Sequence, residues 1–182
     1  EKVIESDRHP HIQAERLLVP SFPDALGWLS SQALAFHRHQ FLSTIHRGDS
    51  QFPTRIYISR NQSSYRQVIN ENEAIACLKQ YGFVPIALES LSVEQQACLF
   101  ANAEAIVAPH GSGLTNLMFC RPGTTVIELV SPHYIRHYYW VISQQLGLHH
   151  YYIKGESFNC YPILQLMYQN PLKKDVLISQ KS

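Results

Sequence analysis

The sequence predicts an α/β fold built on a doubly wound, mainly parallel sheet. From residue 54 onward, short apolar runs alternate with longer segments in which apolar residues recur at helical spacing. The short runs are apolar almost without interruption, which is typical of strands in a parallel sheet whose two faces are both covered by helices. Right-handed crossovers between such strands produce a Rossmann-like domain.

Five strands are expected in this region, and each is rich in β-branched or aromatic residues. They are RIYIS (55–59), FVPIAL (83–88), AIVAP (105–109), TVIELV (125–130) and HHYYIK (149–154). DVLIS (175–179) is a candidate sixth strand, and RLLVP (16–20) is a candidate strand ahead of the domain.

Capping residues place the helix ends. Helices are expected over 30–45, 70–82, 92–103 and 134–147. Ser31 is the expected N-cap of the first, and capping boxes at Asn70–Glu73 and Ser92–Gln95 open the second and third. Gly82 and Gly147 suit the left-handed residue that ends a helix.

The chain divides at about residue 53. Residues 1–53 contain prolines at 10, 20 and 23 and one helical pattern, so we expect a lead-in and a linker helix there. Residues 54–182 carry the alternating pattern of the Rossmann-like domain. The first residue is Glu1 rather than methionine, and we expect the chain to be part of a longer protein.

Composition excludes several classes of partner. Lys and Arg number 15 against 14 Asp and Glu, a net charge of +1 that does not favour a nucleic-acid partner. No apolar run approaches the roughly 18 residues of a membrane-spanning helix. The four cysteines are widely spaced and form no CxxC pair, so we expect them to be reduced and the protein to be cytoplasmic.

The turn HGSG (110–113) directly follows the third strand of the domain. In open parallel sheets, ligands bind in the crevice beyond the carboxyl ends of the strands. The main-chain N–H groups from Gly111 to Leu114, at the start of a short helix expected near Leu114, would point into that crevice and suit a phosphate. A tight strand-to-helix turn without a ligand is the alternative interpretation of so short a motif.

Four neighbouring residues favour a nucleoside diphosphate. Arg60 and Arg66 follow the first strand and could clamp phosphate oxygens, although a surface ion pair is the alternative for each. Glu89 follows the second strand and could contact a base or ribose. Glu128 lies near the end of the fourth strand, where a carboxylate can bind ribose hydroxyls; its alternative is a buried carboxylate paired with a base.

Several of these segments together resemble the carboxyl-terminal half of the family-61 glycosyltransferases. They are RIYISR, NENE and the run from GFVPIALESLSVEQQACLF to GTTVIEL, with HGxGLxN at 110–116 the most specific. The resemblance runs from about residue 12 to about residue 155. The family includes protein O-linked N-acetylglucosamine transferases and plant xylosyl and arabinosyl transferases.

The resemblance implies a GT-B architecture of two Rossmann-like lobes and an inverting transfer without an essential metal or other cofactor. The donor would be a nucleotide-sugar, which we expect to be a UDP-sugar, and the acceptor a glycan or a protein. This chain would be the donor-binding lobe. The N-terminal acceptor lobe, from which the general base often comes, is expected to be missing from it, so no base is assigned.

The positions that match the family's motifs are Arg60, Arg66, Asn72, Glu73, Glu94, His110, Gly111, Gly113, Leu114, Asn116 and Glu128, while Ser112 stands where many members have alanine. The residues expected to bind the nucleotide-sugar are Arg60, Arg66, Glu89, Gly111, Ser112, Gly113, Leu114, Asn116 and Glu128. His110 is the catalytic candidate. It could instead contact the donor sugar or brace the turn.

Three other classes of function match parts of the sequence. A metal site would need a third ligand near His133 and His137, and none is obvious in the sequence. A serine hydrolase could use HGSG as an oxyanion loop, but the chain contains no GxSxG elbow. A non-catalytic nucleotide-binding or docking domain is the strongest alternative.

Overall fold

The computed structural model describes residues 7–8, 11, 13–19, 29–43, 52–63, 66–132, 134–156 and 178. These residues form a five-stranded, all-parallel sheet with helices on both faces, which confirms the predicted α/β, Rossmann-like class. The elements in chain order are α1 (Ser31–Leu42), β1 (Arg55–Ile58), α2 (Glu71–Lys79), β2 (Val84–Ile86), the 3₁₀ turn η1 (Leu88–Ser90), α3 (Val93–Asn102), β3 (Ala105–Pro109), the 3₁₀ helix η2 (Ser112–Phe119), β4 (Thr125–Val130), α4 (Tyr138–Leu146) and β5 (His149–Lys154).

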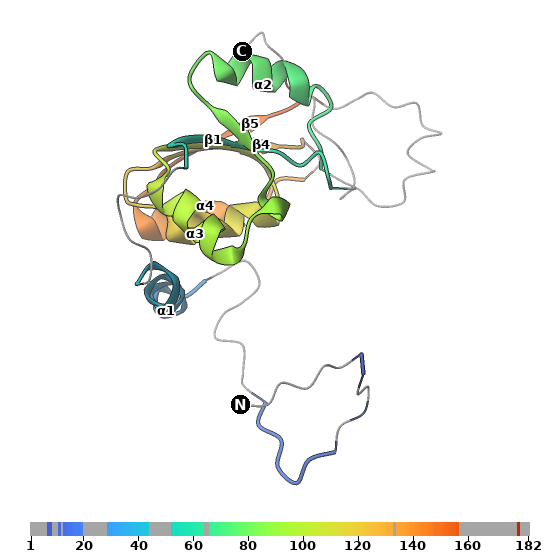
Figure 1. Ribbon diagram of the computed structural model, residues 1–182, viewed down its shortest axis with the longest axis vertical. Coiled ribbons are helices and arrows are strands. Elements are labelled where there is room, and N and C mark those ends of the chain that lie inside the picture. The colour runs from blue at the N-terminus through green and yellow to red at the C-terminus, as the bar shows by residue number, and fades with distance from the viewer. Residues whose placement is uncertain are drawn as a thin grey trace.

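The strands lie in the order β2-β1-β3-β4-β5, and each neighbouring pair is parallel. The chain runs outward from β1 to β2, then crosses back over β1 to β3 and continues to β5. Because crossovers are right-handed, this reversal changes the face that they cover. Figure 1 shows the result, with α2 on one side of the sheet and α3 and α4 on the other. The reversal between β1 and β3 leaves a crevice beyond the carboxyl ends of those strands.

Two apolar clusters cover the two faces of the sheet. The larger lies under α3, η2 and α4 and includes Ile106, Val126 and Phe100, all fully buried. The smaller lies under α2 and includes Tyr57 and Val107. Neighbouring residues of β3, Ile106 and Val107, thus point into different clusters, which is why this strand has an uninterrupted apolar sequence.

The ends of α2 and α3 test the predicted capping motifs. The box at α3 is confirmed: Ser92 Oγ accepts from the Gln95 N–H at 3.2 Å, and the Ser92 N–H donates to Gln95 Oε1 at 2.8 Å. The box at α2 is wrong, because Asn70 makes no side-chain bond to the helix backbone. Its amide instead pairs with the main chain of Ile178, donating to the carbonyl at 2.7 Å and accepting from the N–H at 3.0 Å.

Other helix boundaries are mostly as predicted. Gly82 and Gly147 have positive φ angles of 81° and 67°, which confirms them as left-handed residues after α2 and α4. The N-cap of α1 is Ser30 rather than Ser31, since Ser30 Oγ accepts from the Ala33 N–H at 3.1 Å. Helix α4 begins at Tyr138, four residues later than the pattern suggested.

The strand expected at RLLVP is wrong for its described residues, 16–19, which belong to no strand. Leu17, Leu18 and Val19 are between 74% and 78% exposed, so no sheet or core covers them. The candidate strand at 175–179 lies outside the described residues except for Ile178, which is not in a strand.

Helix α1 packs onto the layer formed by α3 and η2. Phe41 contacts Phe119 with ring centres 5.5 Å apart, and Arg38 donates to the carbonyl oxygens of Cys120, at 2.8 Å, and Met118. Within the described ranges, Cys120 is free and buried, and Cys77 is free and exposed.

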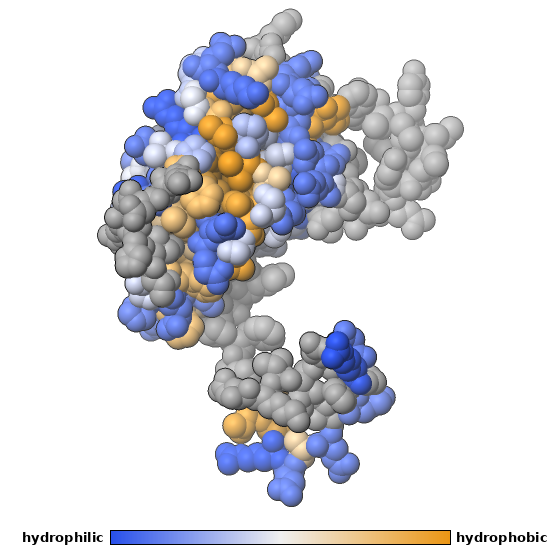
Figure 2. Space-filling model, viewed as in Figure 1, coloured by the Kyte–Doolittle hydropathy of each residue, from blue (hydrophilic) through white to orange (hydrophobic). Residues whose placement is uncertain are grey.

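Apolar residues gather in a band on the face shown in Figure 2. Val84 on the edge strand β2 is 41% exposed and Val93 at the start of α3 is 53% exposed.

No helix among the described residues has both the length and the apolar character needed to cross a bilayer.

Candidate functional site

A cavity of about 230 Å³ opens where the carboxyl ends of β1 and β3 lie side by side. The two strands are neighbours in the sheet although β2 separates them in the sequence, so the loops that follow them reach the same place. The lining residues are Ile58, Ser59, Arg60, Leu88, Glu89, Gln96, Ser112, Gly113 and Asn116. This is the crevice in which the sequence predicted a ligand site.

The glycine turn presents open main-chain N–H groups at this cavity, which Ser112 and Gly113 line. Within the described part of the chain, the N–H groups of Gly111, Ser112 and Gly113 donate to no acceptor. The N–H of Leu114 donates to the Gly111 carbonyl oxygen at 2.9 Å. The expectation of an open amide at Leu114 is therefore wrong, because η2 is a 3₁₀ helix that begins at Ser112 and uses this bond as its first.

Neighbouring side chains approach both glycines of the turn closely. A Cβ atom on Gly111 would lie 2.2 Å from Nη1 of Arg60, and one on Gly113 would lie 2.8 Å from Cδ1 of Leu88. Arg60 is 8% exposed and lines the cavity. The absence of a side chain at Gly111 thus allows the guanidinium of Arg60 to lie against the turn, beside the open N–H groups.

Arg66 lies at a second, narrower hollow, which it lines together with His110, Leu129, Ser131 and Tyr134. Its Cζ atom is 5.5 Å from the centre of the Tyr134 ring, within the range of a cation–π contact. The φ angle of Arg66 is 57°, in the left-handed region that residues other than glycine seldom adopt. Such backbone strain is concentrated at functional sites.

Side-chain hydrogen bonds fix part of the cavity wall. Asn116 Nδ2 donates to Gln96 Oε1 at 2.8 Å and to the Gly113 carbonyl oxygen at 3.2 Å. Gln96 Nε2 in turn donates to the Leu88 and Leu91 carbonyl oxygens at 3.0 and 3.1 Å. These bonds tie η1, α3 and η2 together around the cavity. Glu89, which is exposed on η1, completes the lining.

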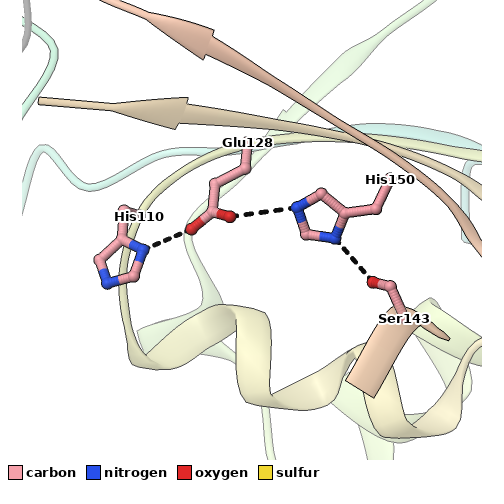
Figure 3. A network of polar contacts seen from close by, with 4 residues as sticks. All are labelled: His110, Glu128, Ser143 and His150. Carbon is pink, nitrogen blue, oxygen red and sulfur yellow. Dashed lines mark hydrogen bonds and ion pairs between the residues drawn. The ribbon is translucent and has the colours of Figure 1, made fainter. Parts of the chain in front are cut away.

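A buried chain of four polar side chains runs from the turn into the fold (Figure 3). His110 Nδ1 contacts Glu128 Oε1, and the other oxygen, Oε2, lies 3.1 Å from His150 Nε2. His150 Nδ1 lies 2.7 Å from Ser143 Oγ on α4. His110, Glu128 and Ser143 are each at most 3% exposed. The side chain of His150 is 3% exposed. The structure therefore shows the alternative considered for Glu128, a buried carboxylate paired with bases.

The surroundings of Glu128 stabilise its charged form. Burial alone would raise the pKa of Glu128, but the hydrogen bonds and charges of His110 and His150 outweigh burial, so its pKa is lowered. Tyr139 of α4 packs with its ring centre 5.0 Å from that of His110. Burial, and then the charge of Glu128, raises the pKa of Tyr139 to about 12.

The structure brings together only some of the expected site residues. Arg60, Glu89, Ser112, Gly113 and Asn116 meet at the cavity, while Arg66 and His110 share the narrower hollow. Sequence reasoning missed Gln96, Tyr134, Tyr139, Ser143 and His150. The alternation of β5 already placed His149 and His150 on opposite faces, but only the pairing of β4 with β5 shows that His150 meets Glu128.

Among the described residues, no group of three or more His, Cys, Asp or Glu side chains could hold a metal ion. His133, one of the histidines considered for such a site, lies outside these ranges.

A parallel sheet with open N–H groups and a cavity at the reversal of strand order is typical of α/β proteins that bind anionic ligands. Residues 4–127 match the glycosyltransferase 61 family. The chain belongs to this family, which the sequence motifs predicted.

Curated relatives match shorter stretches of the chain. The EGF domain-specific O-linked N-acetylglucosamine transferase of Drosophila melanogaster is 34% identical over 76 residues, which are 40% of this chain and 14% of that protein. The transferase of the same name from Gallus gallus is 26% identical over 102 residues, 52% of this chain and 19% of that protein. A beta-1,2-xylosyltransferase of Oryza sativa subsp. japonica is 37% identical over 71 residues, 38% of this chain and 15% of that protein. The chain thus spans less than a fifth of the length of each of these relatives.

Proposed function

We propose that this chain is the donor-binding part of a glycosyltransferase. The enzyme would transfer a sugar from a nucleotide-sugar, which we expect to be a UDP-sugar, to a glycan or protein acceptor. Membership of the glycosyltransferase 61 family and relatives named as N-acetylglucosamine and xylosyl transferases support this reaction class. A GT-B architecture, with inversion at the anomeric carbon and no essential metal, is part of the proposal.

The observation that carries the proposal is the open glycine turn. Three consecutive N–H groups, those of Gly111, Ser112 and Gly113, have no acceptor among the described residues, and Ser112 and Gly113 line the cavity. Arg60 adds a fixed positive charge beside them. A diphosphate would accept hydrogen bonds from the N–H groups and pair with the guanidinium.

The same groups would assist the chemical step. As the acceptor oxygen bonds to the anomeric carbon, the bond from that carbon to the diphosphate breaks and its electron pair leaves on the phosphate oxygen. Donors already directed at that oxygen stabilise its growing charge without reorganising. The acceptor hydroxyl also loses its proton to a general base, which we place in the part of the protein outside this chain.

The small size of the cavity supports a donor site that this chain shares with another part of the protein. Pockets for small molecules usually occupy about 300–1,000 Å³, whereas this one has about 230 Å³. The volume suits a diphosphate with part of the nucleoside, and the remainder of the donor would contact another part of the protein. We therefore expect the chain to bind nucleotide weakly and to transfer nothing by itself.

Calorimetric titration with uridine diphosphate and UDP-sugars tests the proposal. Binding should be lost in Arg60→Ala and retained in Arg121→Ala, the matched control, because Arg121 precedes β4 at the opposite end of the sheet and is exposed. Equal loss in both variants would contradict a site at the turn. Transfer to an acceptor by the 182-residue chain alone would show that the acceptor lobe is not needed.

The same titration also tests the non-catalytic alternative. A docking domain would show no affinity for any nucleoside diphosphate, while a nucleotide-binding domain without activity would bind yet fail to support transfer when joined to its full-length protein. A serine hydrolase would cleave ester substrates and ignore nucleotides.

A further inference from the structure

Two amide side chains, those of Gln96 and Asn116, line the cavity from different elements. Gln96 lies on α3, and Asn116 lies on η2, three residues after Gly113 of the glycine turn. Both residues are half-buried, and a hydrogen bond of 2.8 Å joins Asn116 Nδ2 to Gln96 Oε1. Because an amide can both donate and accept, what this pair offers a ligand depends on the orientation of each amide.

Main-chain carbonyl groups fix the orientation of both amides. One end of the Gln96 amide lies 3.0 and 3.1 Å from the carbonyl oxygens of Leu88 and Leu91, so this end must be the donating Nε2. The other end, Oε1, is an acceptor, and Asn116 must therefore present Nδ2 to it. The Gly113 carbonyl oxygen, 3.2 Å from the same Nδ2, requires the same orientation of Asn116.

This orientation leaves the side-chain oxygen of Asn116 available to a ligand. Both protons of Nδ2 are engaged, one by Gln96 and one by the carbonyl group of Gly113. Among the described residues, no N–H or O–H group donates to Asn116 Oδ1. An amide oxygen accepts hydrogen bonds and cannot donate them. At the cavity wall, Asn116 thus offers a ligand an acceptor and no donor.

The cavity therefore combines two kinds of wall. The guanidinium of Arg60 and the N–H groups of Ser112 and Gly113 attract anions. The oxygen of Asn116 and the carboxylate of Glu89, which also lines the cavity, repel phosphate oxygens and attract hydrogen-bond donors. A ligand that suits both walls carries an anionic group joined to a group with O–H or N–H donors. A nucleoside diphosphate has this composition, because ribose carries hydroxyl groups and the uracil ring carries an N–H.

We propose that Asn116 is a specificity-determining residue for the nucleoside. Its Oδ1 accepts a hydrogen bond from a ribose O–H or a base N–H of the bound nucleoside diphosphate, and Gln96 is the positioning residue that keeps Oδ1 available. This inference rests on the proposed donor site and adds to it a criterion for the ligand. An analogue that lacks the donor group binds more weakly, because Oδ1 is left unpaired in the occupied cavity. Inorganic pyrophosphate, which has no nucleoside, depends on the turn and Arg60 alone.

Nuclear magnetic resonance of the side-chain amides tests the orientation without a ligand. The Nδ2 protons of Asn116 should exchange with solvent at least about tenfold more slowly than those of Asn72, which is exposed. Gln96→Met, which keeps the length of the side chain and removes its amide, should reduce this protection, because one of the two acceptors is gone. Exchange at Asn116 as fast as at Asn72 would overturn the fixed orientation and the inference with it.

Calorimetric titration measures the selectivity for the nucleoside. Uridine diphosphate is compared with its 2′-deoxy and 3′-deoxy analogues, which each lack one ribose hydroxyl, and with cytidine diphosphate, which lacks the N–H of the uracil ring. At least one analogue should bind the unsubstituted chain about tenfold more weakly, and the analogue affected identifies the group that Asn116 contacts. In Asn116→Leu this ratio of affinities should fall to near one, while the affinity for inorganic pyrophosphate is retained. Gln96→Met should change the ratio in the same direction.

Asn102→Leu is the matched control and should keep the ratio of the unsubstituted chain. Asn102 is another half-buried amide, which donates to the Cys98 carbonyl oxygen at 2.9 Å within α3 and does not line the cavity. Equal affinities of the unsubstituted chain for all four diphosphates, or an unchanged ratio in Asn116→Leu, would overturn the inference and leave the donor site intact. Should Asn116→Leu fail to fold, an unchanged ratio in Gln96→Met overturns the inference in its place. Absence of binding of both uridine diphosphate and pyrophosphate would overturn the proposed function itself.

Discussion

Gly111 joins the two features on which the proposed site depends. Its N–H is the first of the open donors, and the missing side chain leaves room for the guanidinium of Arg60. A left-handed backbone is not the reason for a glycine at this position, because the φ angle of 178° is ordinary extended geometry. The requirement comes from the close approach of a charged side chain.

Gly111→Ala should weaken nucleoside diphosphate binding with little loss of stability. The added Cβ would lie 2.2 Å from Arg60 Nη1, and the far end of an arginine side chain can move away at low cost. The moved guanidinium no longer lies beside the open N–H groups, so we expect affinity for uridine diphosphate to fall at least about tenfold. Ser112→Ala is the control, because it keeps the main-chain donors and changes only an exposed side chain. Equal affinity in Gly111→Ala and the unsubstituted chain would contradict this role of Arg60.

Glu128 should make the stability of the fold dependent on acid pH. Its folded pKa is lowered from the ordinary value of 4.5 by the two histidines that outweigh its burial. A carboxyl whose pKa is lowered on folding stabilises the protein above the unfolded pKa, and this contribution is lost as the pH falls through the folded pKa. Urea unfolding midpoints should therefore decline below about pH 4.5, and Glu128→Gln should lack that part of the decline.

The informative quantity is the slope of the urea unfolding midpoint with pH, because Glu128→Gln also changes the stability at neutral pH. Glu104→Gln, which alters an exposed carboxyl, should retain the slope of the unsubstituted chain. Parallel curves for Glu128→Gln and the unsubstituted chain would show that the buried pairing does not contribute.

At the level of elements, α3 supports the cavity through its first turns. Its capping box fixes the start of the helix, and Gln96, four residues after Ser92, holds both η1 and Asn116. Ser92→Ala should destabilise the fold by about 1 kcal/mol, because the Gln95 N–H loses its acceptor. Thermal unfolding should show a decrease of roughly 2–4 °C. Ser90→Ala, which removes a hydroxyl bonded within η1 and outside the box, should change the melting temperature less.

Local sequence predicted the elements where local forces decide them. The core strands β3 and β4 match their predicted bounds because both faces are buried, and α3 matches because its cap is made within one turn. The cap of α2 could not be predicted, since Asn70 is engaged by Ile178, 108 residues further along the chain. The apolar segment at 16–19 shows the limit of composition, because Leu17 and Leu18 are exposed despite their apolar character.

Part of the candidate site was predictable because some of its residues directly follow predicted strands. Arg60 and the glycine turn follow strands directly, so a parallel sheet brings them to one edge whatever the strand order. The partners of Glu128 depend on which strands are neighbours. His110 and His150 reach Glu128 because β3 and β5 flank β4, and the order of strands is not encoded in any local pattern.

At the scale of the whole molecule, the reversal of strand order between β1 and β3 determines where a ligand can bind. Helices α1, α3 and α4 lie on one face of the sheet and α2 lies on the other (Figure 1). The larger apolar cluster lies under α3 and α4, and the cavity opens beyond the carboxyl ends of β1 and β3. The chain spans 14–19% of the relatives named above. The acceptor and the general base in our proposal are therefore assigned to the remainder of the protein.

The most direct test of the donor site is to follow the main-chain N–H resonances while uridine diphosphate is added. We expect the signals of Gly111, Ser112 and Gly113 to shift markedly, because their N–H groups have no acceptor among the described residues until a phosphate arrives. Leu114 is an internal reference, since its N–H already donates to Gly111 and should move less. Binding that leaves the three signals in place and shifts residues of β5 or α2 instead would contradict the account.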